Sequence, residues 1–393
     1  MTEGRSYWLC RLTTTGSLYS ANVQRPRMDS HPCEVVSVEK LIRPGACIES
    51  VQNRMSAADG VQSAASGVLG TGVVVIGRNE GERLQRCLQS VRGLSGRTAY
   101  VDSGSTDDSV AMSRSSGAAI VVELDQATPF TAARARNEGF QRLLEIHPRL
   151  NYVFFVDGDC EVAAGWVESA IRFLDQHPDV AIVWGLLRER YPENSVYNLL
   201  QDIEWQEYPL GEINACGGIA VVRVTAFQEV QGYRPDLICG EEPELCLRLR
   251  HHGWKIWRIP ESMALHDAAM DHFGQWWKRS LRSGYGYAQG AALHGRPPER
   301  HWVVESRRAW VWGLWIPVVV IVLAFAAGWW ALLLLLVYPL QVVRLALRGS
   351  HSPRENWLRA ATLVLGKFPE MLGQLKFTLD RYRHARPRLI EYK

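Results

Sequence analysis

The stretch Tyr152-Val153-Phe154-Phe155-Val156-Asp157-Gly158-Asp159 places two aspartates directly after a continuous apolar run. Five apolar residues rich in valine and phenylalanine indicate a strand buried on both faces, as the strands of a parallel sheet are. In open α/β sheets ligands bind beyond the carboxyl ends of the strands, which is where Asp157 and Asp159 stand. Their carboxylate oxygens suit Mg²⁺ or Mn²⁺ and leave the open side of the ion for substrate phosphates. For the tripeptide taken by itself, a solvated acidic turn is the alternative.

The sequence around this stretch alternates between short apolar runs and segments of helical period, starting at Thr71. Leu84, Cys87, Leu88 and Val91 recur at i, i+3, i+4 and i+7, which predicts an amphipathic helix. The predicted strands cover residues 73–76, 98–101, 119–123 and 152–156, and a second helix covers about 132–145. This alternation predicts an α/β domain with a mostly parallel, Rossmann-like sheet over residues 69–272.

Residues 309–343 form an uncharged, largely apolar run of 35 residues. As one helix the run would extend roughly 52 Å, well beyond a hydrocarbon core of about 30 Å. Two short transmembrane helices over residues 309–346, with a turn near Ala327-Gly328-Trp329, fit better. A buried pair of globular helices is the alternative. Because arginines flank both ends, the positive-inside rule places both ends of the hairpin in the cytoplasm.

The remaining segments are assigned from their composition. Residues 1–68 combine Ser, Gly, Ala and Pro with scattered charge, which predicts a disordered extension. Residues 273–308 contain aromatic and basic anchors typical of interfacial linker helices. Residues 347–393 are basic and amphipathic, and fit either a helix along the membrane or a surface helix interrupted at Pro369. Basic charge around an apolar run favours a membrane, and not nucleic acid, as the partner.

The cysteines and the N-terminus bear on the cellular compartment. The eight cysteines include no CxxC pair, and Cys87, Cys160, Cys216 and Cys246 fall within predicted core or motif segments, which indicates reduced thiols. The residues after Met1 lack the apolar core of a secretory signal. We therefore expect the globular α/β domain to face the cytoplasm at the inner membrane.

Four motifs follow one another along the predicted sheet. They are Val75-Ile76-Gly77-Arg78-Asn79-Glu80, Val101-Asp102-Ser103-Gly104-Ser105-Thr106-Asp107-Asp108-Ser109, Ala133-Arg134-Ala135-Arg136-Asn137-Glu138-Gly139 and Asp157-Gly158-Asp159. In order and spacing they resemble the family 2 glycosyltransferases of GT-A fold. Further on, Gly217-Gly218-Ile219 and Gly240-Glu241-Glu242-Pro243-Glu244 resemble the acceptor-side loop and the acidic catalytic motif of that family. The resemblance covers residues 72–267, and it implies a metal-dependent transferase that uses a nucleotide-sugar donor.

The resemblance also implies which residues hold the donor. Asn79 and Glu80 would line the pocket for the nucleotide base, and Asp102 would accept a hydrogen bond from the base or ribose. Arg134 and Asn137, near the start of a helix, would contact the diphosphate. A solvated helix charge is the alternative for each arginine of this motif.

For the metal, the resemblance implies Asp159 as the most direct ligand, with Asp157 nearer the ribose or a metal-bound water. His266, at the end of a strand over 255–265, stands where a third ligand or a phosphate contact is expected. A structural histidine is the alternative.

The acidic pair Glu241 and Glu242 provides the candidate base, since the acceptor hydroxyl must lose a proton as it attacks the anomeric carbon. By the family pattern Glu242 holds the base position, with Glu where Asp is commoner, and Glu241 is the competitor. The alternative for one of them is a helix N-terminal acid. Gly217 and Gly218 would lie on the acceptor side.

The expected reaction is an inverting transfer of sugar to a lipid-linked or surface-polysaccharide acceptor, in contact with polysaccharide-assembly proteins. Gln275-Trp276-Trp277-Lys278-Arg279 lacks the Arg-Trp order of the Gln-x-x-Arg-Trp signature of processive synthases, which favours addition of one or few sugars. The alternatives are transfer to a polyprenyl phosphate and a catalytically silent, membrane-bound nucleotide-binding protein.

Overall fold

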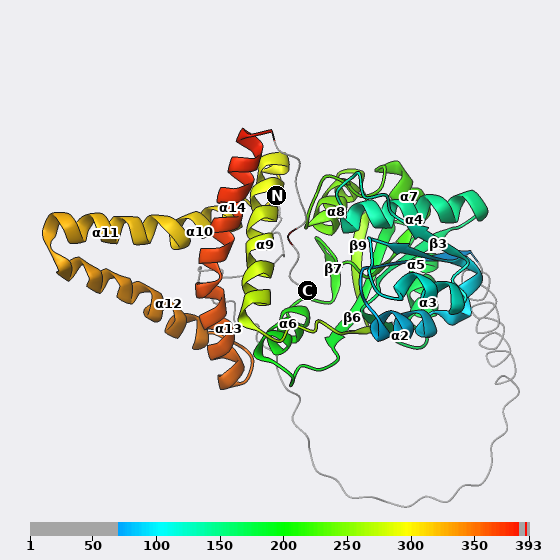
Figure 1. Cartoon of the computed structure of the whole chain (residues 1–393), viewed down its shortest axis with the longest axis horizontal. Coiled ribbons are helices and arrows are strands. Elements are labelled where there is room, and N and C mark those ends of the chain that lie inside the picture. Colours follow the sequence, from blue (N-terminus) through cyan, green and yellow to red (C-terminus); the bar gives the residue numbers. More distant parts are fainter. Residues whose placement is uncertain (1–69, 385–389, 391–393) are drawn as a thin grey trace, which may run out of the picture.

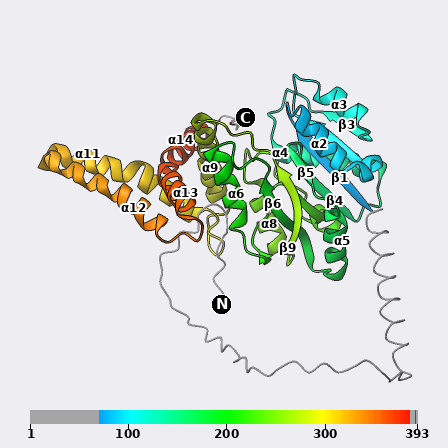
Figure 2. The same cartoon turned by 90° about the horizontal axis from the view of Figure 1, so that it is seen from below.

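The computed structural model describes residues 70–384 and residue 390, so the predicted extension over 1–68 lies outside the described residues. The described chain has two parts. Figure 1 shows an α/β domain on one side and, on the other, a group of C-terminal helices from which a long hairpin projects. The same separation is visible in the perpendicular view of Figure 2.

A nine-stranded mixed sheet forms the centre of the α/β domain, in the order β3-β2-β1-β4-β8-β6-β9-β5, with β7 paired to β9. The strands are β1 (Thr71–Gly77), β2 (Thr98–Asp102), β3 (Ile120–Glu123), β4 (Tyr152–Asp157), β5 (Cys160–Val162), β6 (Val180–Glu189), β7 (Gly211–Ile213), β8 (Ala220–Arg223) and β9 (Lys255–His266). Strands β3, β2, β1 and β4 are parallel neighbours and correspond to the four predicted strands. The other half adds antiparallel pairs of β8, β5 and β7 to a parallel β6–β9 pair.

Helices cover both faces of the sheet, as right-handed crossovers between parallel strands require. Figure 1 shows α2 and α3 below the sheet and α4 above it. The helices of this domain are α2 (Glu82–Ser90), η1 (Arg92–Arg97), α3 (Ser109–Ser115), α4 (Ala132–Ile146), α5 (Trp166–Gln176), α6 (Val196–Gln206), α7 (Val224–Glu229) and α8 (Glu241–His251). The amphipathic pattern of α2 is explained by its buried residues Leu84, Cys87 and Leu88.

The register of the sheet brings several polar residues to one edge. Gly77 at the end of β1 lies opposite Asp102, and the preceding Ile76 lies opposite Asp157. On the other half of the sheet, His266 at the end of β9 lies opposite Cys160. The loops that follow β1, β2, β4 and β9 therefore converge on one region, which is the place predicted for a site.

The C-terminal helices begin with α9 (Phe273–His294), which lies side by side with α14 (Lys367–Tyr382) in both views (Figures 1 and 2). The two helices approach so closely that a Cβ added to Gly284 would lie 1.9 Å from the carbonyl oxygen of Glu370. A Cβ on Gly373 would lie 2.0 Å from the carbonyl oxygen of Leu281. Glycine at both positions thus allows direct contact between the two backbones.

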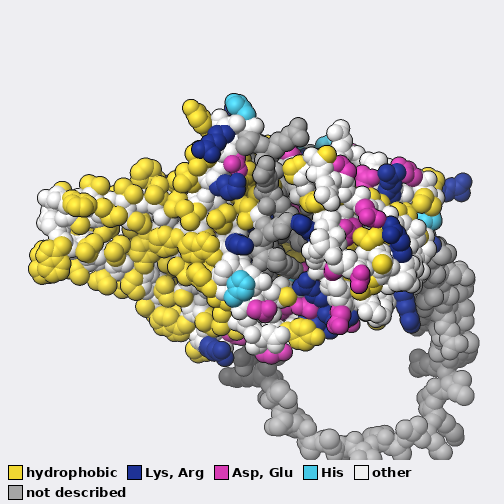
Figure 3. Space-filling model, viewed as in Figure 1, with side chains coloured by type: hydrophobic (Ala, Val, Ile, Leu, Met, Phe, Trp, Pro, Cys, Tyr) yellow, Lys and Arg dark blue, Asp and Glu magenta, His cyan; other side chains and the backbone are white. Residues whose placement is uncertain are grey.

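The hairpin consists of two apolar helical segments. The first runs over Val303–Ala327 and comprises α10 (Val303–Trp310), a π-helical turn η2 (Val311–Trp315) and α11 (Ile316–Ala327). After Gly328, which has φ 99°, the second segment over Trp329–Ala346 comprises the 3₁₀ helix η3 (Trp329–Leu336) and α12 (Val337–Ala346). Both segments are long and apolar enough to cross a membrane. They are mostly exposed, and Figure 3 shows hydrophobic side chains over the length of the hairpin.

Two details differ from the sequence-based picture. The boundary at residues 308 and 309 falls inside a continuous helix, because the helix that carries the first apolar run already starts at Val303. The C-terminal helix pair, α13 (Pro353–Leu365) and α14, is interrupted at Gly366, so the predicted break at Pro369 is wrong. Pro369 lies in the first turn of α14, where a missing N–H costs no helical hydrogen bond.

Candidate active site

A cleft of about 490 Å³ opens at the edge where the strand ends converge. Its walls come from the loop after β1, the start of α4, the loop after β4, the start of α8 and one face of α9. The lining residues are Ile76, Gly77, Arg78, Asn79, Glu80, Arg83, Ser103, Phe130, Thr131, Ala132, Arg136, Asp157, Asp159, Cys239, Gly240, Glu241, Glu242, His266, Arg279, Arg282, Ser283, Tyr287 and Trp302.

Arg136 organises the carboxylates of this cleft. Its side chain is 3% exposed and donates to Glu241 at 3.0 Å and to Glu242 and Asp157 at 2.8 Å each. A planar guanidinium presents several donors at fixed angles, which allows one residue to hold three carboxylates. Gly218 lies against this cluster, since an added Cβ would be 2.3 Å from an Arg136 Nη atom. The cluster therefore needs a glycine beside it.

Glu242 is buried at the start of α8. Burial and the adjacent charge of Glu241 raise the pKa of Glu242 to about 8, and the attraction of Arg136 opposes this rise. A carboxyl with a pKa near the working pH is suited to general base catalysis. Glu241 shares the same arginine, so the structure keeps both acids at one place.

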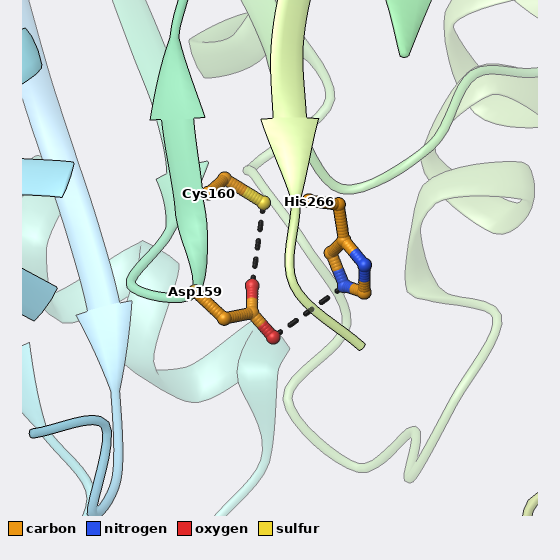
Figure 4. Close-up of side chains that lie close together, drawn as sticks. All are labelled: Asp159, Cys160 and His266. Carbon is orange, nitrogen blue, oxygen red and sulfur yellow. Dashed lines mark hydrogen bonds and ion pairs between the residues drawn. The ribbon is translucent and has the colours of Figure 1, made fainter. Parts of the chain in front are cut away.

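Asp159, Cys160 and His266 bring potential metal ligands together, with ligand atoms within 4.8 Å of one another. Figure 4 shows the three side chains turned toward one another. The His266 Nε2 lies 3.4 Å from an Asp159 carboxylate oxygen, and the Cys160 thiol donates to the other oxygen at 3.3 Å. The His266 Nδ1 lies 3.0 Å from buried Glu189. The contact of Nδ1 with Glu189 favours the tautomer with the proton on Nδ1, which would leave Nε2 to coordinate a metal together with Asp159.

The donor chemistry of this group fits Mn²⁺ or Mg²⁺, which take carboxylate oxygens, with imidazole nitrogen suited to transition metals. Burial and the negative charges of Asp159 and Asp157 raise the pKa of the Cys160 thiol well above its ordinary value. The thiol is therefore protonated and donating, and the carboxylate and imidazole are the better ligands. Asp157 lies outside this group and accepts from Arg136, although it lines the same cleft.

The loops after β1 and β2 are joined by hydrogen bonds. The Asn79 side chain accepts from the Thr106 N–H at 2.7 Å, and the Ser105 hydroxyl accepts from the Asn79 N–H at 2.9 Å. Asn79 adopts φ 55°, which asparagine tolerates better than most residues. Asp102 is buried and accepts from the hydroxyl of Tyr100 and from Ser105. Asn79 and Glu80 face the cleft, whereas Asp102 supports the loop beside it.

Arg134, Asn137 and Gly217 do not line the cleft. The guanidinium of Arg134 donates to the side chain of Asp125 and to backbone carbonyls of residues 125 and 128. The Asn137 side chain bonds both the N–H and the carbonyl of Tyr233. Gly217 packs against Trp184. In this conformation the contacts of all three residues lie within the α/β domain and outside the cleft.

Sequence reasoning missed Arg136 and the whole wall formed by α9. Arg136 carried a detectable signal, since it shares the helix face of Phe140 and Leu143, four and seven positions later, which are buried. An arginine on a buried face requires anionic partners. Arg279, Ser283 and Tyr287 lie four residues apart along one face of α9 and all line the cleft. Their role depends on tertiary packing of a segment that sequence assigned to the membrane interface.

Two family descriptions match the chain: glycosyl transferase family 2 over residues 72–231, and glycosyl transferase family group 2 over residues 152–348, half of the chain. Pre-mycofactocin glycosyltransferases from two strains of Mycobacterium tuberculosis are 31% identical over 212 residues, which cover 50% of this chain and 42% of theirs. The chain thus matches less than half the length of these curated relatives.

Among solved structures, a mannosyltransferase from Pyrobaculum calidifontis in complex with GDP-Man and Mn²⁺ superposes with a TM-score of 0.50. The sequence identity is 17%, and the match covers 78% of this chain and 86% of that one, which is a likeness of fold. The motifs along the sheet, the cleft at its edge and the family matches agree, and the chain belongs to glycosyl transferase family 2, with a catalytic domain of GT-A fold.

Proposed function

We propose that this protein is a metal-dependent, inverting glycosyltransferase that moves a sugar from a nucleoside diphosphate donor to an acceptor hydroxyl. One observation carries the proposal: the group around Asp159 and His266 and the buried acid Glu242 line one cleft, with Arg136 among them. The relatives named as glycosyltransferases, and the fold neighbour solved with GDP-Man and Mn²⁺, support the same class of donor and ion.

On the donor side, Asn79 and Glu80 take the nucleotide base, and buried Asp102 positions the loop that carries Ser103 into the cleft. Asp159 and His266 would hold Mn²⁺ or Mg²⁺, with Asp157 close to the ribose. When bound there, the ion would supply positive charge to the leaving diphosphate. Arg136, and not Arg134, places its guanidinium in the cleft, where it holds Asp157 of the donor side next to Glu241 and Glu242.

On the acceptor side, Glu242 accepts the proton of the attacking hydroxyl. The oxygen attacks the anomeric carbon in line with the departing diphosphate, so the configuration at that carbon inverts, and no covalent sugar forms on the protein. Arg136 holds Glu242 and Glu241 in place and favours the charged, proton-accepting form of Glu242. Gly218 leaves room for this arginine.

The hairpin suggests where the reaction takes place. The uncharged part of the first helix, residues 309–327, would extend about 28 Å at 1.5 Å per residue. The second segment would extend about 31 Å, with 2.0 Å per residue in its 3₁₀ part, and both lengths are close to a hydrocarbon core of about 30 Å. We propose that the hairpin enters the cytoplasmic membrane and that the catalytic domain faces the cytoplasm. This position favours a lipid-linked or surface-polysaccharide intermediate as acceptor, handled together with polysaccharide-assembly proteins.

The test is donor hydrolysis and transfer by the detergent-solubilised protein, with released nucleoside diphosphate as the readout for UDP- and GDP-sugars. We expect release with Mn²⁺ or Mg²⁺ and its loss on EDTA treatment. Asp159→Asn should abolish the metal-stimulated part, whereas Glu138→Gln, an exposed change on α4, should not. A folded protein that releases no nucleoside diphosphate from any donor contradicts the proposal.

A second acceptor class is a polyprenyl phosphate. The observation in its favour is that Arg279 and Arg282 line the cleft from α9, opposite the strand ends. A phosphate oxygen needs little help from a base, so Glu242→Gln would then keep considerable activity. The response of this one variant separates the two acceptor classes.

A further inference from the structure

A second cavity, of about 240 Å³, lies where the catalytic domain meets the C-terminal helices. Its walls come from α6, from α9 and from α13, three helices that Figure 1 shows close together near the base of the hairpin. Its lining includes Leu200 and Glu204 of α6, Trp276 and Arg279 of α9, and Arg359 and Leu363 of α13.

This cavity adjoins the catalytic cleft along α9. Arg279, Ser283 and Tyr287 line both of them. Their spacing of four residues places them in one row along α9, because side chains at i and i+4 lie on the same helix face. The row from Arg279 to Tyr287 therefore borders both spaces, and a ligand that follows it would extend from the cleft toward the second cavity.

The lining suits the apolar part of an amphiphile. Aromatic and aliphatic side chains such as Leu200, Trp276 and Leu363 contribute to each of the three walls. Two of the acids are paired with arginines across the walls, Glu204 with Arg279 at 3.2 Å and Glu207 with Arg359. Pairing lowers the cost of placing an apolar group beside these charges.

The cavity also adjoins the hairpin. Ala360 and Val364 of α13 form a buried cluster with Leu345 and Ala346 at the end of the second apolar segment. The next residues on α13, Thr362 and Leu363, line the cavity. One helix thus packs on a predicted membrane helix and also forms a wall of the cavity, which places the cavity between the membrane and the cleft.

We propose that this cavity is the subsite for the apolar portion of an amphiphilic, lipid-linked acceptor, whose polar end reaches the cleft past Arg279. As a statement about the acceptor this rests on the proposed function. Binding of an amphiphile in the cavity does not require transfer, so the two can be tested separately.

The experiment uses the full chain in nanodiscs of phosphatidylcholine and phosphatidylglycerol. The probe is a farnesyl phosphate analogue with a diazirine on its terminal isoprene unit, and the labelled peptides are identified by mass spectrometry. We expect labels on peptides of α6, α9 and α13, and competition by unlabelled farnesyl phosphate. Labels confined to α11 and α12, as bulk lipid contact would give, overturn the proposal.

Cavity-filling variants make the test specific. Leu200→Trp fills the cavity from α6, and Leu363→Trp fills it from α13. If one variant fails to fold, the other still tests the proposal. Each should lower labelling of these peptides by about tenfold or more, a change of about 1.4 kcal/mol in binding. Ala361→Trp, which adds the same bulk at an exposed position of α13, should not. Unchanged labelling in both filled variants overturns the proposal.

Hydrolysis of the nucleotide-sugar donor in the same samples separates this proposal from the proposed function. Leu200→Trp should keep hydrolysis, because the residue is outside the cleft, while transfer to the amphiphile falls. If wild-type protein is labelled in the cavity but hydrolyses no donor, the subsite stands and the proposed function fails. If the wild-type protein hydrolyses donor but is not labelled in the cavity, the subsite fails and the proposed function stands.

Discussion

Replacing Arg136 with methionine removes the cation that three carboxylates share. Methionine keeps most of the apolar length of the side chain, so the change is mainly one of charge and hydrogen bonding. Glu241 and Glu242 would be left at 5% and 10% side-chain exposure, without the donor that now satisfies both, and Asp157 at 33% exposure. Removing one partner of a buried charge cluster costs about 3–5 kcal/mol in unfolding free energy.

Protonation reduces that cost at neutral pH. The pKa of Glu242 is about 8 with Arg136 in place and is higher still without it, so Glu242 of the variant is protonated at pH 7. We therefore expect a loss near the lower end, about 3 kcal/mol at pH 7. Because the folded-state pKa is raised above the unfolded value, the folded variant binds more protons than the unfolded chain. Its stability relative to wild type should fall further as pH rises above about 8, where Glu242 ionises in the wild type and stays protonated in the variant.

The assay is chemical unfolding of the detergent-solubilised variant at several pH values, together with donor hydrolysis. Arg142→Met on the same helix is the matched control, since Arg142 pairs with Glu138 and Glu145 at the surface and its loss should change little. Arg136→Met combined with Glu241→Gln should recover part of the stability. A variant as stable as wild type at pH 8, or a loss that shrinks as pH rises, refutes this account of the cluster.

Three further predictions follow from single side chains. Glu242→Gln should lower transfer to a hydroxyl acceptor by about 10²–10⁴-fold, with donor binding retained. In the wild type, kcat/KM should rise toward pH 8 as Glu242 loses its proton. Full transfer activity of the variant would assign the base to another residue. Glu189→Gln should weaken Mn²⁺ binding by about tenfold, because Glu189 orients the imidazole of His266; unchanged affinity by calorimetry contradicts the metal site. Burial lowers the pKa of His301 to about 4, so the unfolded chain binds the proton more readily, and stability should fall by about 2 kcal/mol from pH 7 to 5. His301→Gln should lose that part of the pH dependence of thermal unfolding, and an unchanged slope would exclude His301 as its source.

The first half of the sheet could be predicted from the sequence because β1, β2 and β4 are buried on both faces. Their sequences are therefore continuous apolar runs that end at polar residues. The second half could not be predicted in the same way. Strand β7 has three residues and β6 shows register shifts against β9, so both are defined by their partners in the sheet. The apolar hairpin was predictable from its uncharged length, and its turn at Gly328 matches the expected position.

Which residues of the site could be predicted depends on the same difference between the two halves of the sheet. Asp159 and His266 follow strands whose ends were predicted, and the structure brings their ligand atoms together. Arg134 and Arg136 stand in one motif, so the sequence does not distinguish their roles. Only the three-dimensional positions of their carboxylate partners show that Arg136 is the one in the cleft. The metal, donor and base assignments for these residues stay predictions.

The glycine contact between α9 and α14 also fixes the distance between these two helices. Helix α9 carries Gly284 at this contact and, one residue before it, Ser283 at the wall of the cleft. A side chain at residue 284 would push the two backbones apart and carry the cleft wall with them. A variant at Gly284 should therefore prefer acceptors of a different length, although none of the residues assigned to the chemistry is substituted.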